Sequence, residues 1–435
     1  MTSSDSRHCK TCGAPLDLDP RDADAWNDRA VARHQLGDLA DAIRDYGRAI
    51  ELDPGDFGAW TNRGAARLEA GDREGALADA DRANAIEPSA TAWVTRGNAR
   101  CELGDIRGSI EDFDRALDLA PDDARAWNNR GLSRQALGEL REALGDLDRA
   151  VALDPEFASA YANRASLRQA LGDLPGALAD GDRAIAIDPT EATGFLSRGL
   201  ARRDLGDLDG ALEDFERAVA LAPRWAKAWT NRGNVHHELG DPQRAIEDYA
   251  HAIGLDELDP GPWIDRAMAR QALGDLAGAL EDLDRGVALG PGDPMAYNDR
   301  GAVRQLAGDV RGAIEDYDRA IEIQPEFARA FNNRGLARRL LRELPAAVAD
   351  HTRAIELDPG HAEAWYNRAL SRRDLGDAEG AILDLVRTVE LQPEDARAWF
   401  QLGATRQARG DRPGAVADYD RAIAIRPDPL PALCK

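Results

Sequence analysis

Residues 364–393 read AWYNRALSRRDLGDAEGAILDLVRTVELQP, and this stretch decides the fold because its pattern recurs along most of the chain. Its aromatic residue, Trp365, has counterparts every 34 residues, with a single interval of 33 between Trp60 and Trp93. A small residue stands four positions after each aromatic, and alanine stands sixteen positions after it in eleven of twelve copies. The aromatic positions are Trp26, Trp60, Trp93, Trp127, Tyr161, Phe195, Trp229, Trp263, Tyr297, Phe331, Trp365 and Trp399. A fixed period of this length predicts an array of stacked units.

Each copy carries the signals for two helices and two short turns. Small residues let two helices approach closely, and the aromatic side chain fills the space beside them. A glycine followed by aspartate, as in Gly37-Asp38, is typical of a helix end followed by an N-cap. Proline, 28 positions after the aromatic in eleven copies, ends the second helix because it disfavours helical backbone at the residue before it. Since one helix pair cannot bury its apolar face alone, we predict an all-α stack of pairs.

The residues at these positions resemble a known family. Ala364-Trp-Tyr-Asn-Arg-Ala, followed by Leu375-Gly-Asp, Ala381-Ile and Leu391-Gln-Pro, resembles a tetratricopeptide repeat. Twelve tandem copies of this Asn-Arg-Gly type cover nearly the whole chain, and we number them from the N-terminus. The resemblance implies a right-handed α-solenoid, a superhelix of helix-turn-helix repeats with a concave groove. Members of the family usually bind a peptide or a partner protein in that groove.

Composition excludes several classes of function. The 435 residues include 79 acidic and 55 basic side chains, for a net charge of −24, and phosphate repels so acidic a chain. No apolar run approaches the roughly 18 residues of a membrane span, and residues 1–19 lack the apolar stretch of a signal peptide. We therefore predict a cytoplasmic protein that binds neither nucleic acid nor membrane. Only three of the basic residues are lysines, which indicates a bacterial, GC-rich genome.

Charged residues repeat at fixed distances from the aromatic. They predict a series of arginine–aspartate contacts inside the array, one in each copy, which we call the ladder. Arginine stands three and seven residues after the aromatic in eleven copies each, and aspartate stands nineteen residues after it in all twelve. We expect the arginine stems to pack on apolar surface while their guanidinium groups meet the aspartate. A row of anion-binding arginines is the alternative. The ladder pairs chosen as representatives are Arg29 with Asp45, Arg130 with Asp146, Arg300 with Asp316, and Arg368 with Asp384.

Variation along the first helices marks a candidate partner-binding groove. The resemblance places the groove on this helix, whose variable positions are mostly polar in copies 1 to 5 and apolar or basic towards the C-terminus. An exposed apolar strip with arginines suits an amphipathic or acidic-hydrophobic peptide, whereas packing of these leucines against neighbouring helices is the alternative. The candidate residues are Asn128, Asn129, Leu336, Arg339, Leu340, Tyr366, Asn367, Leu370, Arg373, Arg397 and Phe400.

Asparagines recur just after the aromatic, as at Asn129 and Asn367. An amide both donates and accepts hydrogen bonds, so such a row could hold an extended peptide backbone; solvation of the helix surface is the alternative. The dicarboxylate clamp of some family members does not fit, because Val94 and Ser159 stand where that clamp has lysines.

The two ends of the chain differ from the array. Cys9 and Cys12 form a Cys-x-x-Cys pair, but structural zinc needs four ligands and the chain has no second pair of this kind. A zinc site, a redox pair and an exposed tail are the alternatives. We predict an N-terminal tail over residues 1–22 with a remnant of a truncated repeat, the array over residues 23–429, and a C-terminal tail over residues 430–435. We expect the last repeat to lack a capping helix over its apolar surface, and this exposed surface would allow self-association.

The chain shows no nucleophile–base pair, phosphate-binding loop or metal-binding helix motif. We therefore predict a non-enzymatic scaffold without a cofactor that binds a protein or peptide in the groove. The alternatives are a metal- or redox-responsive adaptor that uses Cys9 and Cys12, and a self-assembling structural array. In copy 7 Glu257 replaces the proline and Pro260 follows, which predicts a locally different turn before copy 8.

Overall fold

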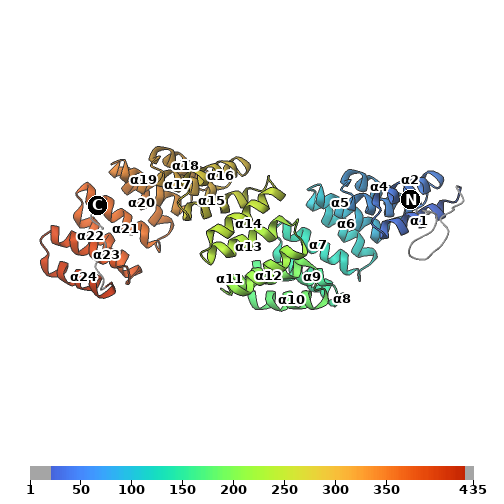
Figure 1. Ribbon diagram of the computed structural model, residues 1–435, viewed down its shortest axis with the longest axis horizontal. Coiled ribbons are helices and arrows are strands. Elements are labelled where there is room, and N and C mark those ends of the chain that lie inside the picture. Colours follow the sequence, from blue (N-terminus) through green and yellow to red (C-terminus); the bar gives the residue numbers. More distant parts are fainter. Residues whose placement is uncertain (1–20, 427–435) are drawn as a thin grey trace, which may run out of the picture. The chain divides into compact units, whose positions relative to one another are not determined.

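The computed structural model describes residues 21–426. Within this part the chain has no β-strand, and its twenty-four α-helices form twelve successive pairs. The predicted all-α class of tandem helix pairs is thereby confirmed. The chain divides into two compact units, one ending at Pro223 and the other beginning at Arg224, and each described unit contains six pairs (Figure 1).

Helix lengths are nearly uniform in both units, with first helices of 13 or 14 residues and second helices of 14. The first unit contains α1 Ala23–Gln35, α2 Leu39–Leu52, α3 Phe57–Glu69, α4 Arg73–Ile86, α5 Ala90–Glu102, α6 Ile106–Leu119, α7 Ala124–Ala136, α8 Leu140–Leu153, α9 Ala158–Ala170, α10 Leu174–Ile187, α11 Ala192–Asp204 and α12 Leu208–Leu221. The second unit contains α13 Ala226–Glu238, α14 Pro242–Leu255, α15 Pro260–Ala272, α16 Leu276–Leu289, α17 Pro294–Leu306, α18 Val310–Ile323, α19 Ala328–Leu340, α20 Leu344–Leu357, α21 Ala362–Leu375, α22 Ala378–Leu391, α23 Ala396–Ala408 and α24 Arg412–Ile425.

The turn inside each pair follows from a glycine and the acidic residue after it. Gly37 has a φ of 79°, a left-handed conformation that glycine adopts at no steric cost, and ten further copies have glycine there. In copy 10 the same place is taken by Arg342, with a φ of 61°. The carboxylate of Asp105 accepts a hydrogen bond from the N–H of Gly108 at 3.0 Å and so caps α6.

The connection between α14 and α15, residues 256–259, has four residues with a turn at its centre, as do the connections between all other copies except the three-residue one between copies 2 and 3. The prediction of a locally different turn at this point is therefore wrong. Asp256 accepts from the N–H of Leu258 at 3.1 Å, as Asp53 does from Gly55 at 2.8 Å in copy 1. Pro260 occupies the first position of α15, where its missing N–H has no helical partner to lose.

Within each unit the core is a series of small clusters between successive helices. One cluster combines side chains of α21, α22 and α23: Ala369, Ala381, Leu385, Val389, Ala398 and Leu402. Aromatic residues of the second helices insert against glycines of the first, as the buried Tyr317 does against Gly301. A Cβ atom on Gly301 would lie 2.7 Å from that ring, so only glycine permits this approach.

Candidate functional site

In copies 1 to 11 an arginine of the first helix binds an aspartate of the second helix of the same copy. Arg29 donates from Nε and Nη2 to the two carboxylate oxygens of Asp45 at 2.6 and 2.7 Å. Arg368 binds Asp384 in the same way at 2.9 and 2.7 Å, and the Asp384 side chain is almost inaccessible. This parallel two-bond geometry is the strong form of an arginine–carboxylate pair. The same geometry joins Arg130 to Asp146 and Arg300 to Asp316.

A second arginine, one helical turn further along the first helix, binds the same aspartate. Arg33 lies 2.6 Å from Asp45, and Arg372 lies 2.9 Å from Asp384. In the ten copies that have both arginines, one buried carboxylate therefore holds two guanidinium groups, whereas in copy 7 His236 replaces the second arginine. Arginines engaged in this way are not an open row of cations facing a ligand.

The first arginine also contacts the aromatic ring of its own helix and, in several copies, a carboxylate of the preceding copy. The guanidinium of Arg130 lies 4.5 Å from the ring centroid of Trp127, and its Nη1 donates at 2.5 Å to Asp114 of the preceding copy. This second carboxylate was not predicted from the sequence, although aspartate stands 21 residues after the aromatic in seven copies. Equivalent bonds to the preceding copy join Arg96 to Asp81, Arg164 to Asp148, Arg198 to Asp182, Arg300 to Asp284, and Arg334 to Asp318.

The hydrogen bonds between arginine and aspartate in the ladder shift the pKa of the arginine. The hydrogen bond to Asp214 raises the pKa of the Arg198 guanidinium, outweighing the opposing effect of burial. The ladder therefore links the two helices of a copy and, where the second aspartate is present, neighbouring copies.

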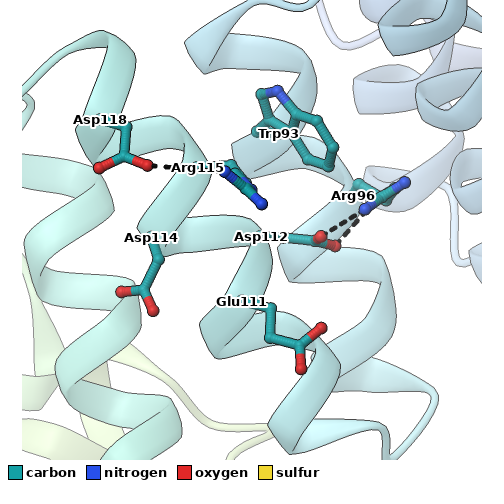
Figure 2. A pocket seen from close by; sticks show the side chains of 7 residues that line it. All are labelled: Trp93, Arg96, Glu111, Asp112, Asp114, Arg115 and Asp118. Carbon is teal, nitrogen blue, oxygen red and sulfur yellow. Dashed lines mark hydrogen bonds and ion pairs between the residues drawn. The ribbon is translucent and has the colours of Figure 1, made fainter.

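A pocket of about 420 Å³ lies beside the ladder of copy 3 (Figure 2). Arg96 is bound to Asp112 in this pocket, and Arg115 lies 4.0 Å from Asp118, so both arginines have carboxylate partners. The pocket is lined by Trp93, Arg96, Glu111, Asp112, Asp114, Arg115 and Asp118. Its walls are thus ladder residues and their acidic neighbours.

Copy 12 departs from the ladder because Leu402 replaces the first arginine. Asp418 is buried, and in the described part of the chain it pairs with a single arginine, Arg406, at 2.9 Å. Burial raises the pKa of Asp418, and the single arginine opposes that shift only in part.

The asparagines that follow the aromatic bond to one another across neighbouring first helices. Asn129 donates to Asn98 at 3.0 Å, and Asn163 donates to Asn128 at 2.9 Å. In the C-terminal unit Asn367 donates to the amide oxygen of the preceding copy's asparagine at 3.0 Å. The structure therefore places Asn128 and Asn367 in packed contacts between copies, since both are buried. Asn129 is half-buried and also lines a pocket of about 220 Å³.

The remaining candidate groove residues lie on α19, α21 and α23, and we call them the C-terminal strip. Side chains of successive first helices meet here, because Arg339 on α19 donates to Asp374 on α21 at 2.8 Å. Arg373 on α21 likewise donates to the amide oxygen of Gln401 on α23. The strip consists of Leu336, Arg339, Leu340, Tyr366, Leu370, Arg373, Arg397 and Phe400.

Side chains of the strip differ in how far they are exposed. Leu340 is 60% exposed, whereas Leu336, Leu370 and Phe400 are half-buried. The ring of Phe400 lies 5.5 Å from that of Tyr419, so part of its surface packs on α24. The strip therefore combines packing within the array with accessible apolar surface.

Arg397 and Tyr366 form the polar edge of the strip. The Arg397 guanidinium lies 5.6 Å from the Tyr366 ring centroid and pairs with Glu363 at 2.8 Å and Asp395 at 3.1 Å. Burial raises the pKa of the Tyr366 hydroxyl. Arg397 and both carboxylates also line a shallow pocket of about 540 Å³.

Several predicted features lie outside the residues that the structure describes. These are Cys9 and Cys12, the remnant repeat before residue 21, and the C-terminal tail at 430–435. Between residues 21 and 426, no group of three or more His, Cys, Asp or Glu side chains is arranged to hold a metal ion. No helix in that range is long and apolar enough to cross a membrane.

Comparisons with known proteins identify the repeat. Family models described as "Tetratricopeptide repeat" or "TPR repeat" match residues 23–56, 97–138, 124–157, 196–261, 306–341, 341–389 and 366–429. No curated protein matches the chain in sequence.

Among solved structures, the crystal structure of the APC/C hetero-tetramer Cut9–Hcn1 is similar with a TM-score of 0.52 and 17% sequence identity. The similarity covers 88% of this chain and 90% of that chain, and it supports the fold. The crystal structure of MamA is 27% identical over 38% of this chain and 96% of that chain, with a TM-score of 0.35. The family matches span more than half of the chain and coincide with its helix pairs. The chain therefore belongs to the tetratricopeptide repeat family.

Proposed function

We propose that the chain is a non-enzymatic scaffold that binds a partner protein or peptide on the C-terminal strip. The family and the fold are typical of protein-interaction scaffolds without chemistry of their own. One observation supports the choice of surface. The position directly after the conserved aromatic holds Tyr366 in copy 11 and Phe400 in copy 12, both only partly buried, whereas no other copy has an aromatic residue there.

The chemistry of the strip suggests what the partner presents. Arg339 and Arg397 are already paired with carboxylates of this chain. Arg373 instead bonds to the neutral amide of Gln401 and lies 3.8 Å from Asp374, which Arg339 also engages. An acidic side chain of a partner would therefore bind best at Arg373, while its apolar side chains contact the neighbouring leucines and Phe400. An amphipathic or acidic-hydrophobic peptide has this combination.

The test is capture of partners from a lysate of the organism that encodes the chain, followed by cross-linking. The variant Tyr366→Ala/Leu370→Ala/Phe400→Ala truncates the strip, and circular dichroism checks that it stays helical. We expect it to bind the captured partner at least about tenfold more weakly, because a few buried aromatic and aliphatic contacts dominate such interfaces. Cross-links from the wild-type complex should fall on α21 and α23.

A matched control truncates apolar residues at corresponding positions of the first unit, Leu132→Ala/Leu200→Ala. Leu132 and Leu200 each stand five residues after the aromatic, as Leu370 does. This control should retain the partner. If the partner binds both variants as strongly as the wild type, the strip serves packing only and the proposal is wrong.

A further inference from the structure

His351 on α20 is a histidine in the packed core without a hydrogen-bond partner. Its side chain is fully buried, and neither Nδ1 nor Nε2 has a hydrogen-bond partner among the described residues. The ring fits against Gly335 of α19, where an added Cβ would lie 2.6 Å from it. The other copies mostly have an apolar or aromatic residue at this position, such as Leu385 in copy 11 and Phe113 in copy 3. Tyr249, which also stands here, satisfies its hydroxyl by donating to Asn234 at 2.7 Å.

The charges around His351 oppose its protonation. Arg339 of α19 and Arg368 of α21 lie close enough for their positive charges to disfavour an imidazolium. On its own helix the neighbouring carboxylate, Asp350, is held by Arg334 at 2.6 Å and by Arg338 at 2.8 Å. Asp374 accepts from Arg339 at 2.8 Å and Asp384 from Arg368 at 2.7 Å, so these carboxylates are engaged as well, and none in the described part of the chain bonds to the imidazole. Burial, together with Arg339 and Arg368, lowers the pKa of His351 to about 3.

The position of His351 connects it to the C-terminal strip. Its ring packs against α19 of copy 10, and α20, the helix that carries it, packs against α21 of copy 11. The strip crosses this junction, with Leu336 on α19 and Leu370 on α21, and the Arg339–Asp374 pair bridges the same two helices. Any opening of copy 10 from copy 11 would separate the two halves of the strip.

We propose that the junction between copies 10 and 11 is an acid-sensitive element, in which protonation of His351 opens the packing of α19 and α20 against α21 and releases a partner from the strip. The release rests on the function proposed above, whereas the opening does not.

The direction of the pH effect follows from the two protonation states. An exposed imidazole titrates near 6.5, so between pH 6.5 and 3 the open form binds a proton that the closed form excludes. The closed form therefore has its full stability above pH 6.5 and loses it as the pH falls. From pH 7 to pH 5 the ratio of closed to open junction should fall about 25-fold.

Hydrogen–deuterium exchange of the full chain tests the opening without any partner. After correction for the intrinsic pH dependence of exchange, amides of α20 should open about 25-fold more often at pH 5 than at pH 7. Amides of α16, where Leu283 holds the corresponding position, serve as the internal control and should not change. In His351→Phe the α20 response should disappear, because Phe113 already packs against a glycine in the same way. His351→Leu repeats the test with the side chain of copy 11.

The inference is overturned if α20 shows no acid response beyond that of α16, or if His351→Phe and His351→Leu respond as strongly as the wild type. Partner release is measured separately on the complex captured at pH 7. Loss of the partner from the wild type at pH 5, with retention by His351→Phe, supports regulation of the strip. Equal retention by both proteins at pH 5 overturns that regulation. The function proposed above fails separately if, at pH 7, the variant with a truncated strip captures the partner as strongly as the wild type.

Discussion

The two faces of the first helices differ in how they change along the chain. The face towards the second helix carries the same arginine and the same aspartate contact from Arg29 in copy 1 to Arg368 in copy 11. The face shared with neighbouring first helices varies: it carries bonded amides such as Asn129 and Asn367, and towards the C-terminus it also carries the apolar and basic side chains of the C-terminal strip. The arginine–aspartate contact stays constant because every copy needs its two helices held together. Residues outside this contact are free to differ among copies, which is why we place recognition there.

The largest effect is expected from breaking the constant face in copy 11. Asp384→Ala leaves Arg368 and Arg372 without their shared carboxylate, and Arg368 is itself buried. Removing one partner of a buried ion pair costs about 3–5 kcal/mol, since the remaining charge is uncompensated. Urea denaturation followed by circular dichroism measures the loss, and hydrogen exchange should locate it in α21 and α22.

Copy 12 supplies the matched control for this prediction. Asp418 binds one arginine rather than two and its pKa is raised by burial, so the carboxylate there contributes less. We expect Asp418→Ala to cost about 1–2 kcal/mol. Equal losses for the two variants would contradict the view that the pair of arginines makes the ladder strong.

The fold could be predicted from the sequence because its determinants are local and repeated. A glycine such as Gly37 and the proline before each new copy stand at a constant distance from the aromatic, and both act on the backbone at their own position. The arginine–aspartate contact within a copy follows in the same way from the pairing of two adjacent helices. Glu257 shows the limit of this reasoning, because the turn keeps its form without the proline.

Contacts between copies could not be predicted in this way. Whether Arg130 reaches Asp114, or Asn129 meets Asn98, depends on the offset between neighbouring pairs, which the period alone does not specify. The same holds for His351, whose lack of partners becomes visible only when the helices that surround it are in place.

A smaller effect is expected at Asn84, a buried amide without hydrogen bonds in the described chain, where a substitution should increase the stability rather than decrease it. Asn84 on α4 is buried, and within residues 21–426 neither its Oδ1 nor its Nδ2 has a hydrogen-bond partner. Ile50 and Leu117 hold the corresponding positions in copies 1 and 3. Asn84→Leu keeps a similar side-chain shape and removes the buried polar atoms, so we expect a gain of about 1–2 kcal/mol in the free energy of unfolding.

The control for this gain is an apolar exchange at the same position of copy 1, Ile50→Leu. That change should alter the stability by less than about 1.5 kcal/mol and is not expected to increase it. An equal increase in both variants would mean that leucine improves packing there for reasons unrelated to the amide. Denaturant midpoints of the full chain, compared at a constant slope, decide between these outcomes.

The smallest effect is expected from the bonded amides, and it sharpens the comparison between the two faces. Asn129→Ala removes one hydrogen bond to Asn98 and the acceptor used by Asn128, at a half-buried position. The expected loss is about 1 kcal/mol, because water can replace part of what is removed. A loss of this size with unchanged partner capture would assign the amides to stacking. Unchanged stability with weaker capture would instead assign them to recognition, and the partner-binding face would then extend well beyond the C-terminal strip.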